Sequence, residues 1–323
     1  MPKPLRPPTV PPQLAIPIGI LALSTASIFI RYAQEFSGSL VIAAYRLSIA
    51  TLVLAPIALW NYRQELKKLG RREITLGILS GTFLALHFAT WITSLEYTSV
   101  ASSVVLVSTS PLWVALLSPI TVKEPLRRAV VAGMFIALLG GVVVGVSDTC
   151  VEVNGKLQCP PIEEFIQGEA FIGDILALAG GLAGAGYILI GRSLRRKMSL
   201  IPYIFLVYGI TAIVLVGIAA GSGQQAVGYP AEFYGWVTLL ALIPQLLGHS
   251  TFNWALRYLS AVYVSITLLG EPIGSTILAI MFLNEIPSLV KLFGAILILA
   301  GIIVASQQKK DTKLGASDAN SMQ

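Results

Sequence analysis

The chain has 323 residues, of which 55% are hydrophobic and only 12% are charged. A soluble protein of this length needs many more charged residues to cover its surface, so the composition argues against a soluble enzyme. The formal net charge is +6, but the basic residues lie in short segments between apolar runs. That placement argues against a nucleic-acid-binding face.

The apolar runs predict ten membrane spans, because each is long enough to cross about 30 Å of hydrocarbon as an α-helix. In chain order they are residues 14–31, 38–60, 74–95, 99–120, 128–146, 168–190, 201–221, 233–256, 260–283 and 288–306. We expect tight hairpins between the third and fourth spans and between the eighth and ninth. The basic start, Lys3 and Arg6, resembles a signal peptide, but cleavage would remove one helix of the repeat described next, so we expect this span to be retained.

A weak internal repeat relates the two halves. One constant shift along the chain places Tyr97 on Tyr258, Pro111 on Pro272 and Glu124 on Glu285. Paired five-span halves are typical of secondary transporters. The sequence therefore predicts an all-α membrane protein with repeats at 14–146 and 168–306, an external loop at 147–167, and tails at 1–13 and 307–323. The seven-residue spacing of Gly133/Gly140 and Gly294/Gly301 predicts a packing seam.

The basic residues predict the orientation. With the N-terminus in the cytoplasm, most of the 22 Lys and Arg residues lie on the cytoplasmic side. Arg31, Lys156 and Lys291 lie outside, and Arg46 lies within a span. The positive-inside rule then predicts that both termini are cytoplasmic. Because each half has an odd number of spans, the repeat is inverted. The short loops favour a bacterial inner membrane.

The external loop contains the two cysteines, Cys150 and Cys159. An oxidising outer compartment favours a disulfide between them, and two free thiols in a mobile loop are the alternative. The spacing matches neither a metal site nor a redox enzyme, and we expect no cofactor and no metal.

Short motifs carry a family resemblance. The second half contains Leu269-Gly270-Glu271-Pro272, Leu283-Asn284-Glu285 and a helix from Gly294 to Gly301. The first half has the same frame in Ser110-Pro111, Lys123-Glu124 and Gly133 to Gly140. With the ten spans and the inverted repeat, these motifs resemble the EamA-type branch of the drug/metabolite transporter superfamily over nearly all of residues 14–306. The resemblance implies export or exchange of amino acids, related metabolites or drugs, often coupled to a cation gradient.

Glu271 is the main candidate for the chemistry, as the only carboxylate near the middle of a predicted span. A charged side chain there is costly unless it is paired or in a watered cavity, so it marks a functional site by default. An apolar setting favours its protonated form, which makes it a candidate proton carrier. Pro272 cannot donate a backbone hydrogen bond, which leaves the Leu268 carbonyl without its helical partner and predicts a helix break. Pro111 and Ser110 are the repeat counterparts. The alternative is a protonated, structural Glu271.

Polar residues at helical spacing predict faces that line a shared cavity. They are Tyr263, Thr267, Glu271 and Ser275 on the ninth span, Gln245, His249, Asn253 and Arg257 on the eighth, and His87, Trp91 and Ser94 on the third. Hydrogen bonding between helices without a ligand is the alternative. The two histidines are each more often structural. For Arg46, within Ala43-Ala44-Tyr45-Arg46, the alternatives are a substrate carboxylate contact and a snorkelling or structurally paired side chain.

Other chemistry lacks its motifs. The chain has no G-x-x-x-x-G-K-[ST] motif of an ATP-driven motor and no H-E-x-x-H motif. Few basic residues enter the membrane, so a sugar-phosphate cargo is disfavoured. We expect a secondary transporter of a small molecule, coupled to protons through Glu271, in a monomer or homodimer. The alternatives are an uncoupled facilitator or exchanger, a membrane-embedded binding protein that transports nothing and, least favoured, an intramembrane enzyme.

Overall fold

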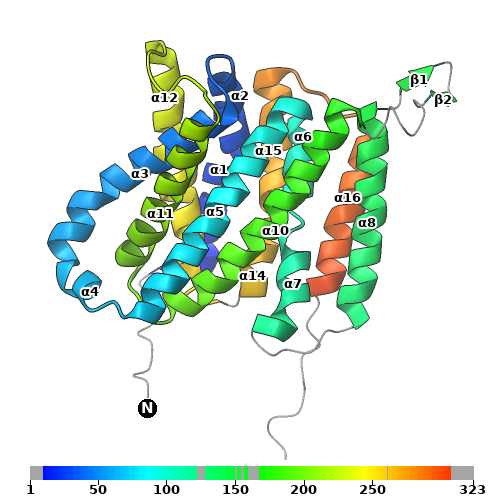
Figure 1. The fold of residues 1–323 in the computed structure, drawn as a ribbon. Helices are drawn as coiled ribbons and strands as arrows, with labels where there is room; N and C mark the ends of the chain where they lie inside the picture. The colour runs from blue at the N-terminus through cyan, green and yellow to red at the C-terminus, as the bar shows by residue number, and fades with distance from the viewer. Residues whose placement is uncertain are drawn as a thin grey trace, which may run out of the picture.

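A computed structural model describes residues 10–121, 128–149, 151–153, 156–158, 167–259 and 261–306 of the chain. The first half is a series of helices (Figure 1). They are α1 (Pro12–Ser24), α2 (Ala26–Gln34), α3 (Ser39–Asn61), α4 (Arg63–Lys67), α5 (Arg71–Tyr97), α6 (Val100–Val107), α7 (Ser110–Thr121) and α8 (Arg128–Thr149). The first predicted span is thus divided at Thr25 into α1 and α2.

The second half follows a small hairpin. Strands β1 (Val151–Val153) and β2 (Lys156–Gln158) pair antiparallel within the predicted external loop, so the all-α prediction omitted one local feature. Cys150 and Cys159, which flank the hairpin in the sequence, lie outside the described residues. The later helices are α10 (Glu169–Arg195), α11 (Leu200–Gly221), α12 (Ala231–Leu240), the π-helix η1 (Ala241–His249), α13 (Ser250–Ala255), α14 (Ala261–Thr267), α15 (Gly270–Leu283) and α16 (Leu289–Ser306).

The helices are apolar enough for a multi-pass membrane protein. Within the described residues, eight helical segments meet the length and hydropathy expected of a span. Two shorter apolar segments, Val131–Val144 and Leu289–Val304, lie within α8 and α16. These two correspond to the fifth and tenth predicted spans. They are shorter than the eight segments that are long enough to be candidate spans.

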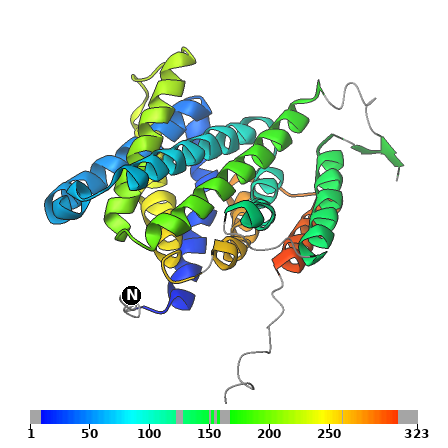
Figure 2. The same ribbon diagram turned by 60° about the horizontal axis from the view of Figure 1, so that its bottom comes forward.

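Helices α8 and α16 form a pair at one edge of the bundle, seen in green and red in both views (Figures 1 and 2). The pair depends on glycine. A Cβ atom at Gly140 would lie 2.7 Å from the carbonyl oxygen of Gly294, and one at Gly301 would lie 2.5 Å from that of Gly133. Such approaches exclude any side chain. The predicted glycine seam therefore joins two helices of the same chain.

Two helix breaks occupy equivalent places in the two repeats. Ser108 and Thr109 separate α6 from α7, and Leu268 and Leu269 separate α14 from α15. Pro111 and Pro272 each follow their break, in the first turn of the next helix, where a missing N–H is tolerated.

The carbonyls released by these prolines are satisfied locally. Val107 O accepts the hydroxyl of Ser110 at 3.1 Å, and Leu268 O accepts the backbone amide of Glu271 at 2.9 Å. Leu268 O therefore lacks the i+4 partner of a regular helix, and a 3₁₀-type turn before Pro272 supplies the Glu271 amide in its place. The prolines break both helices at the centre of the bundle while leaving few unpaired backbone groups there.

Candidate functional site

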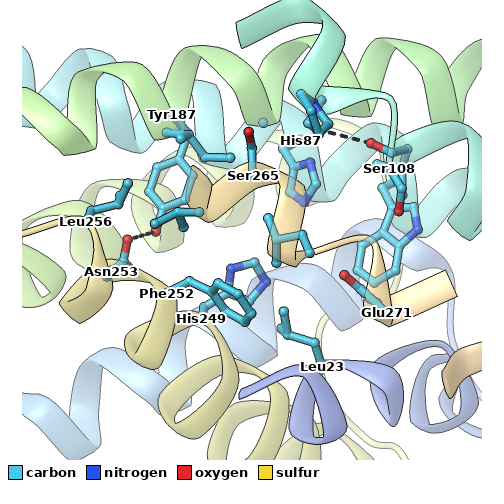
Figure 3. A pocket seen from close by; sticks show the side chains of 18 residues that line it. Leu23, His87, Ser108, Tyr187, His249, Phe252, Asn253, Leu256, Ser265 and Glu271 are labelled. Carbon is cyan, nitrogen blue, oxygen red and sulfur yellow. Dashed lines mark hydrogen bonds between the residues drawn. The ribbon is translucent and has the colours of Figure 1, made fainter. Parts of the chain in front are cut away.

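A cavity lies where both breaks meet the rest of the bundle (Figure 3). Its walls come from α1, α5, the α6–α7 break, α10, η1 with α13, and the α14–α15 break. The volume is about 70 Å³, which is room for a few water molecules. We call it the central cavity.

Some of the polar residues predicted from the sequence line this cavity. They are His87, Trp91, Ser110, His249, Asn253 and Glu271, with Pro111 beside them. They come from α5, α7, η1 with α13, and α15, which are four separate parts of the sequence. The helical spacing predicts only that these residues lie on the polar faces of individual helices. The structure places them together in one cavity.

Glu271 stands at the start of α15 and reaches the cavity (Figure 3). In the described part of the chain, its carboxylate accepts no hydrogen bond and forms no ion pair. Its repeat counterpart Ser110 also lines the cavity but is satisfied, since its hydroxyl donates to Gly181 O at 2.9 Å. The pseudo-equivalent positions thus differ: one is closed by local hydrogen bonds and the other presents a free carboxylate.

Arg46 lies in the protein core, with 0% of its surface exposed, so the snorkelling alternative is wrong. Its Nε donates to Gln245 Oε1 at 2.9 Å, and its guanidinium carbon lies 4.2 Å from the centre of the Phe88 ring. Nη1 and Nη2 have no hydrogen-bond partner among the described residues. Arg46 and Glu271 are close enough for their charges to interact but do not form an ion pair.

The two histidines lie close together beside the Phe88 ring. Their ring centroids are 6.5 Å apart, and the His249 centroid is 5.2 Å from that of Phe88. His87 Nδ1 lies 2.8 Å from Gly180 O. Gly184 makes this packing possible, because a Cβ there would lie 3.1 Å from His87 Nδ1. No group of three or more potential metal-ligating side chains occurs among the described residues.

Tyr187 is a cavity residue that the sequence analysis missed. Its hydroxyl donates to Asn253 Oδ1 at 2.6 Å, and Asn253 Nδ2 donates to the hydroxyl of Tyr208 at 3.1 Å. Asn253 is therefore held in place by two tyrosines. Figure 3 shows the bond from Tyr187, which lies at the cavity wall. The available signal was the position of Tyr187 seven residues after Gly180 and three after Gly184, on the same face of α10.

The polar residues predicted to form one face of the ninth span do not lie on one face. Tyr263 is 45% exposed, and the Thr267 hydroxyl donates to Val264 O within its own helix. Ser275 is buried against α1, where its hydroxyl donates to Ser24 O at 3.2 Å. The break between α14 and α15 causes the difference, because it interrupts the i, i+4 register on which the prediction depends.

The stripe on the eighth span is divided in a similar way. Gln245 contacts Arg46 and does not line the cavity, whereas His249 and Asn253 do. Arg257 Nη1 donates to Met198 O at 3.4 Å, beyond the cavity. This span contains the π-helix η1, whose wider turns shift the register, and Pro244 within it cannot donate to the carbonyl four residues earlier. On α5, Ser94 bonds to Trp91 O and Ser103.

A group of polar contacts joins the helices at the end of the bundle opposite the start of α1 (Figure 1). Arg31 Nη2 lies 3.1 Å from Glu285 Oε1, and each side chain is 27% exposed. Glu285 Oε2 also accepts the backbone amide of Val100, the first residue of α6, at 2.9 Å. Lys291 Nζ donates to Ser99 Oγ at 2.9 Å. Glu285 thus connects α2, the start of α6 and the end of α15.

Comparison with known proteins gives consistent matches along the chain. The model of the EamA-like transporter family matches residues 12–146 and 171–307. An uncharacterized transporter from Archaeoglobus fulgidus is 24% identical over 92% of this chain and 98% of its own length. The pseudopaline exporter CntI of Pseudomonas aeruginosa is 23% identical over 91% of this chain and 96% of its own length.

A solved crystal structure shares the fold. Its TM-score is 0.63 at 20% sequence identity, over 91% of this chain and 96% of that one. The family match covers both helical halves and is independent of the geometry described above. This chain belongs to the EamA-like transporter family.

Proposed function

We propose that the chain is a secondary transporter that exports or exchanges small metabolites, such as amino acids or amphipathic compounds. The observation that carries this proposal is the free Glu271 carboxylate in a cavity formed at two repeat-related helix breaks. Ligand sites of secondary transporters characteristically lie at such interrupted helices near the bilayer midplane. The name of one similar protein, a pseudopaline exporter, supports outward movement of a small metabolite.

The proposal includes a topology of ten spans in two inverted five-helix repeats, bounded at residues 14–146 and 168–306. Helices α8 and α16 supply the fifth and tenth spans, which their mutual packing and apolar composition support. Both termini lie in the cytoplasm, and the hairpin β1–β2 lies outside. The short basic loops support placement in a bacterial inner membrane.

The proposed ligand contains a carboxylate and an amine. Arg46 Nη1 and Nη2 and Trp91 Nε1 are among the buried donor groups that have no hydrogen-bond partner in the described part of the chain. Trp91 and the Glu271 carboxylate both line the cavity, whereas Arg46 is not part of its wall. Because buried polar groups without partners are costly, a ligand that supplies acceptors to the donors and a cation to Glu271 would be favoured.

Transport requires the cavity to enlarge, because about 70 Å³ holds only a few water molecules. The α6–α7 and α14–α15 breaks are suitable hinges, since their backbone is already outside the regular helical hydrogen-bond pattern. The contacts of Glu285 would hold their own end of the bundle closed and would separate when that end opens. In this proposal Glu271 exchanges a proton for substrate, so that a pH gradient drives net efflux.

Substrate-loaded proteoliposomes test the proposal. Efflux of a labelled amino acid or other candidate that follows an imposed pH gradient supports a proton-coupled exporter. Exchange that ignores the gradient supports an uncoupled facilitator, which is the runner-up. Absence of flux for every candidate, from protein that binds one of them, would contradict transport and favour a membrane-embedded binding protein.

A further inference from the structure

A second hollow lies beside the central cavity, between α7, α8 and α10. Its volume is about 570 Å³, and apolar side chains form nearly all of its walls. We call it the α8–α10 groove. Representative wall residues are Leu112 and Trp113 on α7, Phe135 and Leu138 on α8, and Ile175 and Leu178 on α10.

The groove and the central cavity share one wall, the α6–α7 break. Ser108 and Ser110 line the cavity, whereas Thr109, between them, lines the groove with Trp113. A single turn of backbone therefore separates the two hollows. Whatever fills the groove presses on the same segment that shapes the cavity.

Most polar groups along the groove already have partners within the protein. Trp113 Nε1 donates to Thr109 Oγ1 at 3.3 Å, and Thr109 Oγ1 donates to Leu106 O at 2.8 Å. Asp174 is only 7% exposed and has an interaction partner, while its Oδ1 accepts no hydrogen bond from a described residue. A water molecule needs two to four polar partners to occupy a buried site. The groove offers a water molecule few hydrogen-bonding partners. An apolar occupant is therefore favoured.

The groove is open along α8. Phe135 is 63% exposed, Leu138 is 66% exposed and Val142 is 58% exposed. At 1.5 Å per residue, the stretch from Val131 to Val142 rises about 17 Å. One leaflet contributes about 15 Å to the hydrocarbon thickness of a bilayer. The groove is therefore long enough for one extended acyl chain, and the exposed apolar side chains of α8 beside it suit contact with hydrocarbon.

We propose that the α8–α10 groove binds an acyl chain of a membrane lipid and that the bound chain supports the α6–α7 break from behind. The binding site depends only on membrane insertion. The support of the break rests on the proposed transport function, because its consequence is a cavity wall held in position.

Gly141 offers a direct test, because it borders the groove without touching its far wall. A Cβ atom there would meet only Leu106 Cδ2, at 3.8 Å. A leucine at this position can extend into the groove without a clash. Gly217 on α11 is the matched control, since a Cβ there would meet nothing within 4 Å. Gly141→Leu should fill the groove, and Gly217→Leu should add the same bulk elsewhere on a span.

Fluorescence quenching reports the occupant. Trp113 is kept as the sole tryptophan by replacing Trp60, Trp91, Trp236 and Trp254 with Phe, and the full chain is reconstituted in phospholipid brominated along its acyl chains. We expect strong quenching of Trp113, a marked reduction with Gly141→Leu, and no change with Gly217→Leu. Quenching that is absent, or that Gly141→Leu leaves unchanged, would overturn the lipid site.

A second measurement avoids the tryptophan substitutions. In detergent, added phospholipid should raise the unfolding temperature of the native chain and of Gly217→Leu by equal amounts. The rise should be smaller for Gly141→Leu, because its groove no longer admits the acyl chain. An equal rise in all three proteins would contradict the proposal. Neither measurement uses transport, so failure here is distinct from failure of the proposed function.

Discussion

Arg46 and Gln245 are joined by a hydrogen bond of 2.9 Å from Nε to Oε1, and both side chains are 0% exposed. The bond connects α3 with the π-helix η1, whose last residue, His249, lines the central cavity. π-Helical turns occur frequently at functional sites. The contact holds a buried cation next to the cavity and fixes the segment that presents His249.

The Arg46–Gln245 contact should matter for stability. Gln245→Leu removes the only hydrogen-bond partner of Arg46 among the described residues and should cost about 3 kcal/mol, because a buried charge loses its partner. The double variant Arg46→Met/Gln245→Leu should regain much of that loss, since both polar groups are then gone. Thermal unfolding in detergent measures the set. A double variant less stable than Gln245→Leu alone would refute this account of the pair.

The Arg31–Glu285 pair should contribute modestly, because both side chains are partly exposed. In a double-mutant cycle with Arg31→Gln and Glu285→Gln, we expect a coupling energy of about 0.5–1 kcal/mol. High salt should reduce it. Glu285→Gln should also speed opening of the end of the bundle at which this pair lies. We expect faster exchange of substrate for substrate as a result. Strictly additive effects on unfolding would show that the two charges do not stabilise each other.

Much of the fold could be predicted from the sequence, because hydrophobic run length and the repeat are properties of the chain itself. The glycine pairs at Gly140 and Gly294 also led to the observed seam. The polar stripes were predicted less well. Their helical spacing assumes unbroken α-helices, and the breaks at Leu268 and in η1 rotate the following residues away from the assumed face.

The proximity of Arg46 and Glu271 could not be predicted from the sequence either. Nothing in the spacing of Arg46 and Glu271 indicates that they lie within reach of each other's charge, because their helices come from different repeats. Tyr187 was missed for a similar reason: its role depends on Asn253 from another helix. Contacts between distant segments are set by packing, which local patterns do not specify.

The topology gives a direct prediction. Single cysteines placed at Lys68, Lys197 and Glu163, in a chain without Cys150 and Cys159, should label from the cytoplasm at the first two positions and from outside at the third. The reason is the cytoplasmic bias of Lys and Arg. An impermeant maleimide applied to cells and to inverted vesicles makes the measurement. External labelling at Lys68 would reverse the proposed orientation.

The external loop gives a second chemical prediction. Cys150 and Cys159 should form a disulfide, because an oxidising compartment favours it. Mass mapping of non-reduced protein should recover one linked peptide pair. Replacing both cysteines by Ser should lower thermal stability slightly. Transport should stay intact, because no described residue of this loop lines the central cavity. Two free thiols in freshly isolated protein would contradict the bond.

The most direct test of the account is proton-driven transport by Glu271→Gln. The amide keeps the shape of the carboxyl group and removes its charge, so folding should survive. Net efflux driven by a pH difference should collapse at least tenfold, while exchange of substrate for substrate persists. Glu232→Gln, on the exposed first turn of α12, is the control and should behave as the native chain. A Glu271→Gln protein that still concentrates substrate in response to a pH difference would contradict the account.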